Sequence, residues 1–270
     1  MQTRDWRSQP EVTRESIASD LRRLGVRAGD VLLVHSSLSR LGKVAGGADA
    51  AIDALLDAVA PGGTVLFPTL NGSERDGPEC PPVLEVRETP CWTGLIPETA
   101  RQRDVAVRSL HPTHSIAAIG SAAERYASGH ELTSTPCDES SPYYRLIEEK
   151  GSILLLGADH ESNTTLHCLE ELAGVPYHLQ DGWTDGVVVD RDGRRLVVRN
   201  ILHLWRWHRH FARVDEPLEA AGAQVVGKVG LAETRLVRAD RLAEVILPIL
   251  REDQLYLLES DSRREYLATR

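Results

Sequence analysis

Several features that would assign a protein to a class are missing from this chain of 270 residues. No apolar run approaches the roughly 18 residues of a membrane span, and the start, MQTRDWRSQP, lacks the apolar stretch of a signal peptide. Lys and Arg total 31 against 40 Asp and Glu, and the net charge of −9 argues against binding nucleic acid through its phosphates. These absences predict a cytoplasmic protein without a membrane or nucleic-acid partner, and they favour cationic ligands.

Cysteine is also scarce. The four cysteines, Cys80, Cys91, Cys137 and Cys168, are too few and too scattered for a disulfide scaffold in a chain of this length. None belongs to a C-x-x-C pair, so the spacing gives no support for a structural zinc knuckle. We therefore expect reduced thiols.

The apolar pattern alternates between helices and short buried strands. Residues 11–25 and 49–60 carry helical stripes, whereas residues 30–37 are a nearly continuous apolar strand. Two later apolar runs, residues 115–120 and 152–157, each end in glycine and are expected to be strands. Because such strands are typical of a parallel sheet covered on both faces, we predict an α/β fold with a mostly parallel central sheet and helices on both faces.

The second half of the chain is expected to add to this sheet. Residues 186–199 predict a hairpin around Arg191-Asp192-Gly193, which would be an antiparallel addition to the parallel sheet. Residues 207–220 and 239–250 are expected to be helical, with two short strands between them.

Periodicity fails in one long segment. The loop near 70–92 is rich in Pro, Gly, Glu and Asp, and a structureless loop of this length in a compact domain is usually functional. We interpret it as a candidate lid over an active site. No linker or repeat divides the pattern, so residues 1–270 are predicted to form a single domain.

The most informative segment is GADHESNTTLHCLEELAGVP, residues 157–176. Ser162 or Asn163 is expected to cap a helix that carries His167 in its second turn. Asn163 and Glu171 lie four residues either side of His167 and share its face. The helix follows a strand, and open α/β sheets bind ligands beyond the carboxyl ends of their strands. From helical position alone, a buried core histidine is the simpler interpretation, since only a pocket or a shifted pKa marks a base.

A second histidine cluster lies in SLHPTHS. His111 and His114 flank a Pro-Thr pair just before a strand, whereas a zinc protease requires both imidazoles on one helical face. A metal-dependent amidohydrolase using these two residues with His130, Cys91 or Cys137 is an alternative enzyme class. The simpler interpretation is that the segment only shapes a turn.

The loop VHSSLSRLGKVAGG follows the first strand. Its hydroxyls and free amides, with Arg40 and Lys43, suit a phosphate or a pantetheine-like chain. It contains neither G-x-x-x-x-G-K-[ST] nor G-x-G-x-x-G, so nucleoside-triphosphate and dinucleotide sites lose their main support.

The segment WRWHRHF, residues 205–211, mixes cations, histidines and aromatic residues. Stacking on nucleic acid is one interpretation, but a single short patch in an acidic chain is weak evidence for it. The start of an amphipathic helix is the simpler account.

Several of these segments together resemble the aminoglycoside 3-N-acetyltransferase family, the antibiotic N-acetyltransferases. The resemblance covers most of residues 15–245 and runs, in order, through LLVHSSLSRLG, GGTVLFPT, GLIPE, HPTHS, SPYYRLIEEKGSILLLG, SNTTLHCLEELAGVPY and GKVGLAETRLV. It implies an α/β fold distinct from the common acetyltransferase fold. It also implies transfer of the acetyl group of acetyl-coenzyme A to an amine, with an aminoglycoside as the expected acceptor.

The resemblance further implies roles for individual residues. His167 would be the catalytic histidine and, on chemical grounds, the general base that takes a proton from the amine. The residues expected to bind coenzyme A are His35, Ser36, Ser37, Leu38, Ser39, Arg40, His111, Ser115 and Ser141. Residues expected to contact the amine are Asn71, Glu170 and Asp215.

The expected mechanism is direct transfer in a ternary complex. A carboxylate should orient the ring of His167, with Glu171 on the same helix face and Glu98 in GLIPE as candidates. We assign no metal ligands and expect no metal requirement. A non-catalytic binder of a cationic small molecule is a third function class, and the sequence leaves a homodimer open.

The net negative charge is concentrated near the segments assigned to the site. Residues 70–98, 131–149 and 157–171 each contribute −4. Much of this charge is expected on solvated surface. Its location nevertheless favours recruitment of a polyamine to His167.

Overall fold

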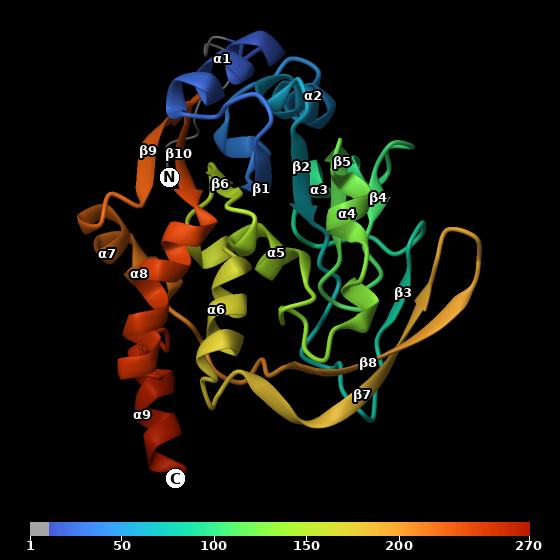
Figure 1. The fold of residues 1–270 in the computed structure, drawn as a ribbon, viewed down its shortest axis with the longest axis vertical. Helices are drawn as coiled ribbons and strands as arrows, with labels where there is room; N and C mark the ends of the chain where they lie inside the picture. The colour runs from blue at the N-terminus through green and yellow to red at the C-terminus, as the bar shows by residue number, and fades with distance from the viewer. Residues whose placement is uncertain (1–10) are drawn as a thin grey trace, which may run out of the picture.

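The computed structural model describes residues 11–270, so the first ten residues, on which the signal-peptide argument rests, lie outside it. Ten strands form two sheets (Figure 1), a main sheet in the order β4-β5-β2-β1-β6-β10-β9 and a small sheet in the order β3-β7-β8. The strands are β1 Val31–Ser36, β2 Thr64–Pro68, β3 Val83–Glu85, β4 Val107–Arg108, β5 Ile116–Gly120, β6 Ser152–Leu156, β7 Leu179–Val189, β8 Arg195–His203, β9 Gln224–Val229 and β10 Ala232–Arg238.

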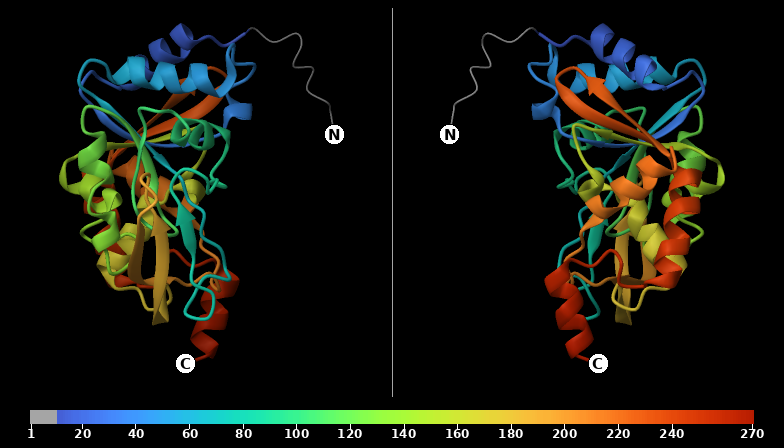
Figure 2. Two further views of the ribbon diagram at one scale, coloured as in Figure 1. Left: turned by 90° about the vertical axis from the view of Figure 1, so that its right-hand side faces the viewer. Right: turned by 90° about the vertical axis from the view of Figure 1, so that its left-hand side faces the viewer.

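Helices cover both faces of the main sheet. Figure 2 shows α1 and α2 above the sheet and α5, α6 and α8 below it. The helices are α1 Arg14–Leu24, α2 Gly47–Val59, α3 Leu95–Arg101, α4 Ala123–Ala127, α5 Pro142–Glu148, α6 Thr165–Ala173, α7 Asp215–Ala220, α8 Ala239–Glu252 and α9 Ser260–Ala268. The predicted α/β class is confirmed.

The two apolar cores follow from the alternation of side chains along the central strands. On β1, Leu33 joins a core with α4, α5, α6 and α8, whereas Leu32 and Val34 join a core with α1, α2 and α3. Since successive strand residues point to opposite faces, a strand covered on both sides needs apolar residues throughout. This requirement explains the continuous apolar run at β1.

Within the main sheet, parallel pairing is confined to the centre, whereas the small sheet also has one parallel pair, β3 with β7. β1 pairs in parallel with β2 and β6, whereas β5 is antiparallel to β2 and β10 is antiparallel to β6. The sequence did predict residues 115–120 as a strand, now β5. Its direction could not be read from the apolar pattern, because burial on both faces looks the same for either direction.

The small sheet corrects two expectations. The hairpin of β7 and β8 is longer than predicted and pairs with β3 instead of extending the main sheet. β3 comes from the middle of the segment 70–92, so this segment is not structureless. The hairpin recruits β3 because Leu84, Val188 and Val198 bury one another in a small separate core.

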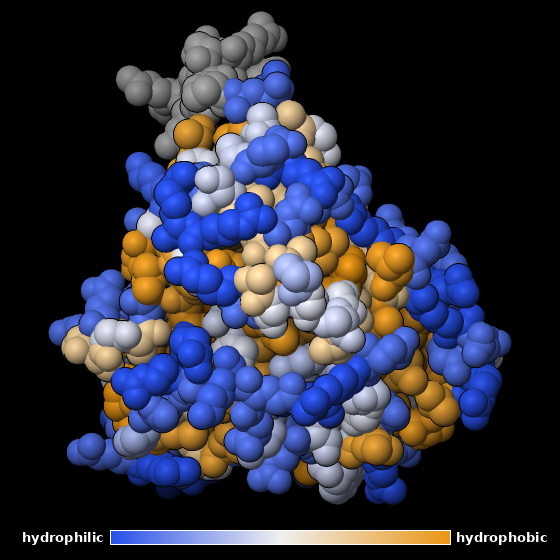
Figure 3. Space-filling view, turned by 45° about the horizontal axis from the view of Figure 1, so that its top comes forward, coloured by the Kyte–Doolittle hydropathy of each residue, from blue (hydrophilic) through white to orange (hydrophobic). Residues whose placement is uncertain are grey.

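The helices near the carboxyl end also differ from the expected pattern. The expected helix over 207–220 is a short 3-10 turn, Phe211–Val214, followed by α7, and α9 was not anticipated. Within residues 11–270, no helix is long and apolar enough to cross a membrane. Figure 3 shows a surface on which apolar residues are interspersed among hydrophilic ones.

Candidate active site

The site lies where the parallel strands β1 and β6 end side by side. Ser36 pairs with Leu156 at this edge of the sheet, and the chain then continues from Gly157 towards α6. Gly157 has a φ of +65°, and a Cβ there would lie 3.0 Å from the Cβ of Arg40 and 3.3 Å from the carbonyl oxygen of Ser37. Glycine therefore lets the two loops that follow these strands pack against each other.

Helix α6 presents His167 to this edge in its first turn. The N-cap residue is Thr164, one position after the expected cap, and Asn163 Oδ1 accepts a hydrogen bond from the backbone N–H of Thr165. The helix ends at Gly174 in the left-handed conformation, as its sequence predicts. The side chain of His167 is 24% exposed, so it is not a core histidine.

A buried carboxylate holds the ring of His167, but it is neither of the two expected residues. His167 Nδ1 lies 2.7 Å from Glu170 Oε2, and the Glu170 side chain is fully buried. Burial opposes ionisation of Glu170, but His178, Arg209 and His167 outweigh it and lower the pKa of Glu170. An ionised Glu170 accepts the Nδ1 proton of His167 and so leaves Nε2 as the basic nitrogen.

Glu171 was expected to orient His167, and this expectation is wrong. Glu171 accepts hydrogen bonds from the hydroxyl of Thr135 and the backbone N–H of Cys137, and its Oε1 lies 2.8 Å from His203 Nε2. Burial raises the pKa of Glu171 to about 8, despite the hydrogen bonds from Thr135 and Cys137 that lower it. Glu171 is therefore a largely neutral acid at pH 7 that ties α6 to the loop before α5.

Glu98, the other expected partner, anchors a loop instead. It forms an ion pair with Arg101 and accepts a hydrogen bond from the backbone N–H of Cys91 at 2.9 Å. Burial raises the pKa of Glu98, but the hydrogen bonds from Arg101 and Cys91 outweigh it and lower the pKa to about 2. A carboxylate committed in this way does not reach the ring of His167.

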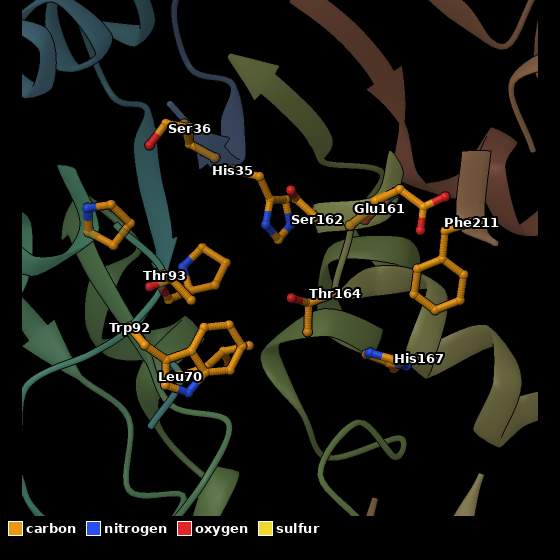
Figure 4. Close-up of a pocket in the computed structure, with 14 residues that line it drawn as sticks. His35, Ser36, Leu70, Trp92, Thr93, Glu161, Ser162, Thr164, His167 and Phe211 are labelled. Atoms are coloured by element: carbon orange, nitrogen blue, oxygen red, sulfur yellow. The ribbon is translucent and has the colours of Figure 1, made fainter. Parts of the chain in front are cut away.

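Two cavities meet at His167. The first, of about 330 Å³, extends from His167 to the end of β1, and the second, of about 320 Å³, extends towards β8 and residues 203–211. Both are lined by Leu70, Trp92, Glu161, His167 and Phe211. Figure 4 shows the first cavity with Leu70, Trp92 and Thr93 on one side and Thr164, His167 and Phe211 on the other. An imidazole shared by two cavities is placed to contact two substrates at once.

Polar atoms without partners line the first cavity at the end of β1. His35 Nε2 and Ser36 Oγ are buried and have no hydrogen-bond partner. Burial lowers the pKa of His35 to about 3, so its ring is neutral. Because unpaired buried polar groups are costly, these two atoms are suited to a ligand that supplies the missing hydrogen bonds.

A groove continues from Ser36 along the loop after β1. Ser37, Leu38 and Ser39 line it together with Gly47 at the N-terminus of α2. Residues 35–39, which the sequence assigns to one binding site, thus line two hollows that share Ser36, and their role in binding stays a prediction. Arg40 lines a different hollow, next to Asp159 and Arg235.

Three other residues assigned to the coenzyme pocket lie away from these hollows, and their assignment stays a prediction. His111 Nδ1 accepts hydrogen bonds from the backbone N–H groups of Thr113 and His114 and shapes the HPTHS turn. Ser115 Oγ donates to the carbonyl oxygen of Thr69, and Ser141 caps α5. All three are buried, and none lines either cavity or the groove.

The residues expected to contact the amine do not line the second cavity. Asn71 Nδ2 donates to the carbonyl oxygen of Pro112, and Asp215 pairs with Arg235 on the far side of the His160 ring. Glu170 lies beneath His167, out of contact with solvent. The contacts of Asn71, Asp215 and Glu170 are thus with other parts of the protein, and their assignment to substrate binding stays a prediction.

Glu161 and five residues of the segment 205–211 line the site, although the sequence did not assign them to it; Arg206 is not among the lining residues. Glu161 is the one acid among the residues lining the two cavities. Trp205, Trp207, His208, Arg209 and Phe211 form a wall of the second cavity, and Trp205 packs edge to face against Trp92. The many aromatic and cationic residues in WRWHRHF could have marked this segment as part of a site. The sequence did not show that the segment lies next to His167 on α6.

Three imidazoles cluster behind the site. One nitrogen each of His167, His178 and His203 lies within 4.8 Å of the others. One nitrogen of each ring is engaged, His167 Nδ1 by Glu170, His178 Nδ1 by Arg209 and His203 Nε2 by Glu171, whereas His178 Nε2 has no hydrogen-bond partner among residues 11–270. We assign no metal ligands among them, and the absence of a metal requirement stays a prediction.

An imidazole held by a buried carboxylate at the junction of two cavities, beyond the strand ends of an α/β sheet, is the arrangement expected of an enzyme that transfers a group between two substrates. The comparisons with known proteins give the family. Residues 33–251 match the family described as aminoglycoside 3-N-acetyltransferase, and the chain belongs to this family. It is an acyltransferase.

Individual relatives cover nearly the whole chain. Aminoglycoside N(3)-acetyltransferase IV of Salmonella is 35% identical over 250 residues, which are 93% of this chain and 92% of the relative. The structure of a mutant of aminoglycoside acetyltransferase AAC(3)-IVa in complex with gentamicin has a TM-score of 0.80 and 32% identity, over 93% of each chain. AAC-IIIb with CoASH has a TM-score of 0.76 and 29% identity, over 90% of this chain and 97% of that one.

Proposed function

We propose that the protein transfers the acetyl group of acetyl-coenzyme A directly to an amino group of an aminoglycoside or a related amine, with His167 as general base. The observation that carries the proposal is the position of His167. Its ring lies at the junction of the two cavities, and its Nδ1 is held by the buried carboxylate of Glu170. One imidazole nitrogen is thereby left to face both substrates.

The first cavity and its groove suit acetyl-coenzyme A, which supplies an activated acetyl group as a thioester. The groove is lined by Ser37 and Ser39 together with apolar residues, which suits the mixed polar and apolar pantetheine chain, and the N-terminus of α2 favours a phosphate. His35 Nε2 and Ser36 Oγ offer hydrogen bonds at the inner end. A relative with the same fold binds CoASH, which supports this assignment.

The second cavity suits the amine. Glu161 supplies negative charge at the junction of the cavities, and Trp92 and Trp205 supply apolar faces on which the non-polar face of a sugar ring could pack. A solved relative is in complex with gentamicin, and the acidic composition of the chain favours cations. These features together support an aminoglycoside as acceptor.

The mechanism follows from the protons that must move. An ammonium cannot attack a thioester, so the amine attacks in its neutral form and loses a proton to His167 Nε2 as the new carbon–nitrogen bond forms. The carbon–sulfur bond then breaks, and the coenzyme A thiolate leaves and takes up the proton held by His167. Glu170 keeps the Nδ1 proton of His167 in place and stabilises the resulting imidazolium. His35 and Ser36, whose buried polar atoms have no partner within the protein, would donate hydrogen bonds to the carbonyl oxygen as it gains charge.

We further propose that the reaction requires no metal, that the protein acts in the cytoplasm as a single domain, and that nucleic acid is not a partner. The −9 net charge argues against nucleic acid. In each of His167, His178 and His203 one ring nitrogen is hydrogen-bonded within the protein, which disfavours a metal ion at that nitrogen.

The test is thiol release from acetyl-coenzyme A across a panel of aminoglycosides and simpler polyamines. His167→Ala should lower kcat by about 10²- to 10⁴-fold, the range typical of a lost general base. Binding of coenzyme A by calorimetry should be retained, which shows that the variant is folded. Unchanged turnover in His167→Ala, or no thiol release with any amine in the wild type, would refute the proposal.

A further inference from the structure

Arg209 differs from its neighbours in WRWHRHF because its charged group points inward. Its side chain is 12% exposed, whereas that of Arg206, three residues earlier, is 55% exposed and pairs with Glu265 on the surface. A buried guanidinium is costly unless its donors are satisfied. The contacts of Arg209 therefore indicate what it stabilises.

All three nitrogens of this guanidinium have partners. Arg209 Nε lies 3.3 Å from Glu170 Oε1, and Nη2 lies 2.9 Å from His178 Nδ1. Nη1 donates to the carbonyl oxygens of Leu204 and Trp207, at 3.2 and 2.7 Å. Because the guanidinium is planar, these contacts fix its orientation and hold the segment 204–209 against Glu170.

The two oxygens of Glu170 are divided between two partners. Oε1 faces Arg209, and Oε2 faces His167. His178 Nδ1 also lies 3.1 Å from Oε2, but a neutral imidazole that accepts a hydrogen bond from Arg209 at Nδ1 has no proton there to donate. His167 is thus the hydrogen-bond donor to Oε2, and Arg209 is the permanent cation in contact with this carboxylate among residues 11–270.

We infer that Arg209 is a positioning residue for the acetyl transfer, which fixes the carboxylate of Glu170 and thereby sets the orientation and basicity of His167. The inference rests on the proposed role of His167. It assigns a role in the reaction to a segment that the sequence alone left without one.

The charge of Arg209 has a predictable effect on the pH dependence. His167 Nδ1 and Glu170 Oε2 share a hydrogen bond, so a proton added to either group changes the charge of the pair. Whichever of the two accepts the first added proton, the pair loses its negative charge and can no longer act as the base. The Arg209 cation opposes that protonation, so its removal should raise the apparent pKa of the pair.

Other groups around the pair remain in place when Arg209 is replaced, so they do not change the direction of this effect. These groups are Glu171 on α6, Glu161 before α6, Tyr177 and His178 before β7, His203 at the end of β8, His114 in the HPTHS turn and His35 on β1.

The experiment compares Arg209→Gln, Arg209→Lys and Arg206→Gln, with kcat and KM measured from about pH 5 to pH 9. In Arg209→Gln, kcat should fall about 10- to 100-fold, the acid limb of the kcat profile should move to higher pH by about 1 unit, and KM for acetyl-coenzyme A should stay within about twofold. Arg209→Lys should keep the acid limb near the wild-type position, because it keeps the charge, but should lower kcat, because one ammonium cannot make the same set of contacts. Arg206→Gln should behave as the wild type.

Two outcomes would overturn the inference. One is an acid limb and a kcat in Arg209→Gln that match those of Arg206→Gln. The other is an equal displacement of the acid limb in Arg209→Lys and Arg209→Gln. If Arg209→Gln does not fold, the pH profile of Arg209→Lys still decides, since a displaced limb with the charge retained contradicts the inference. Failure of the proposed function itself is distinguishable, because His167→Ala would then remain active.

Discussion

At the scale of single residues, His167 pairs with Glu170, whereas the sequence indicated the next residue, Glu171, as a candidate partner. Periodicity places residues at i+3 and i+4 on the same face as residue i, so Glu170 and Glu171 were both within reach. Glu171 is drawn instead to Thr135, Cys137 and His203, all supplied by other parts of the fold. No pattern along α6 could have revealed those partners.

Glu171 gives a prediction about stability and pH. Its pKa is raised from the ordinary value near 4.5 to about 8. The unfolded chain therefore releases this proton at lower pH than the folded chain does, and the free energy of unfolding should fall as the pH rises from about 5 to about 8. Glu171→Gln, which mimics the neutral acid, should lack this contribution and should be more stable than the wild type at pH 8 by on the order of 3 kcal/mol.

Urea unfolding at several pH values measures this difference. The matched control is Glu252→Gln, a change at an exposed acid at the end of α8, which should leave the pH dependence as in the wild type. A wild type and a Glu171→Gln variant that lose stability in parallel between about pH 5 and pH 8 would contradict the raised pKa of Glu171.

At the scale of elements, the segment 70–92 is an anchored wall and not the expected lid. The buried guanidinium of Arg108 donates to the carbonyl oxygens of Thr69, Val86 and Thr89 and to Ser115 Oγ. Burial lowers the pKa of Arg108 to about 10, which still leaves it charged at neutral pH. Length and composition predicted a functional role for the segment. They could not show that Arg108, which follows the segment in the sequence, holds it in place through hydrogen bonds to Val86 and Thr89.

Replacing this anchor tests how the wall is held. Arg108→Met should lower the free energy of unfolding by about 2 to 4 kcal/mol, because several buried carbonyl oxygens lose their donor. Limited proteolysis should then cleave within residues 72–90, where the wild type resists. Arg87→Gln, an exposed change in the same segment, should alter stability by about 0.5 kcal/mol or less. Equal protease resistance in Arg108→Met and the wild type would show that Arg108 is not the anchor.

The positions of most strands and helices along the chain could be predicted, whereas which elements pack or pair with one another could not. Most strands and helices lie where the apolar pattern placed them, because burial on one face or on both leaves a regular trace in the sequence. The pairing of β3 with β7 and the antiparallel direction of β5 depend on contacts between distant segments. The site shows the same limit, since His167 and residues 35–39 were identified, whereas Glu161 and the wall at 205–211 were not.

At the scale of the whole molecule, the net charge of −9 does not describe the charge that a ligand meets in the cavities. Many acids near the site are committed to partners inside the protein, as Glu98 is to Arg101 and Glu170 is to Arg209. Glu161 is the acid that the cavities expose to a ligand. The local field that a cationic substrate meets is therefore set by a few groups and only weakly by the total charge.

The arrangement of two cavities predicts how the two substrates bind. Trp205 lines the second cavity, and Ser39 lines the groove that continues from the first. Trp205→Ala should raise KM for the amine about tenfold, as expected for loss of a large aromatic contact, with little change in KM for acetyl-coenzyme A. Ser39→Phe should narrow the groove and raise KM for acetyl-coenzyme A alone.

Initial-rate kinetics with both substrates varied then test the ternary complex. Since each substrate has a separate route to His167, the double-reciprocal lines should intersect, and no acetylated protein should accumulate without the amine. Parallel lines with an acetyl group trapped on the protein would indicate a covalent intermediate. Variants that each raised both KM values to the same extent would show that the two cavities act as one binding site, and the separate assignment of coenzyme and amine would then fail.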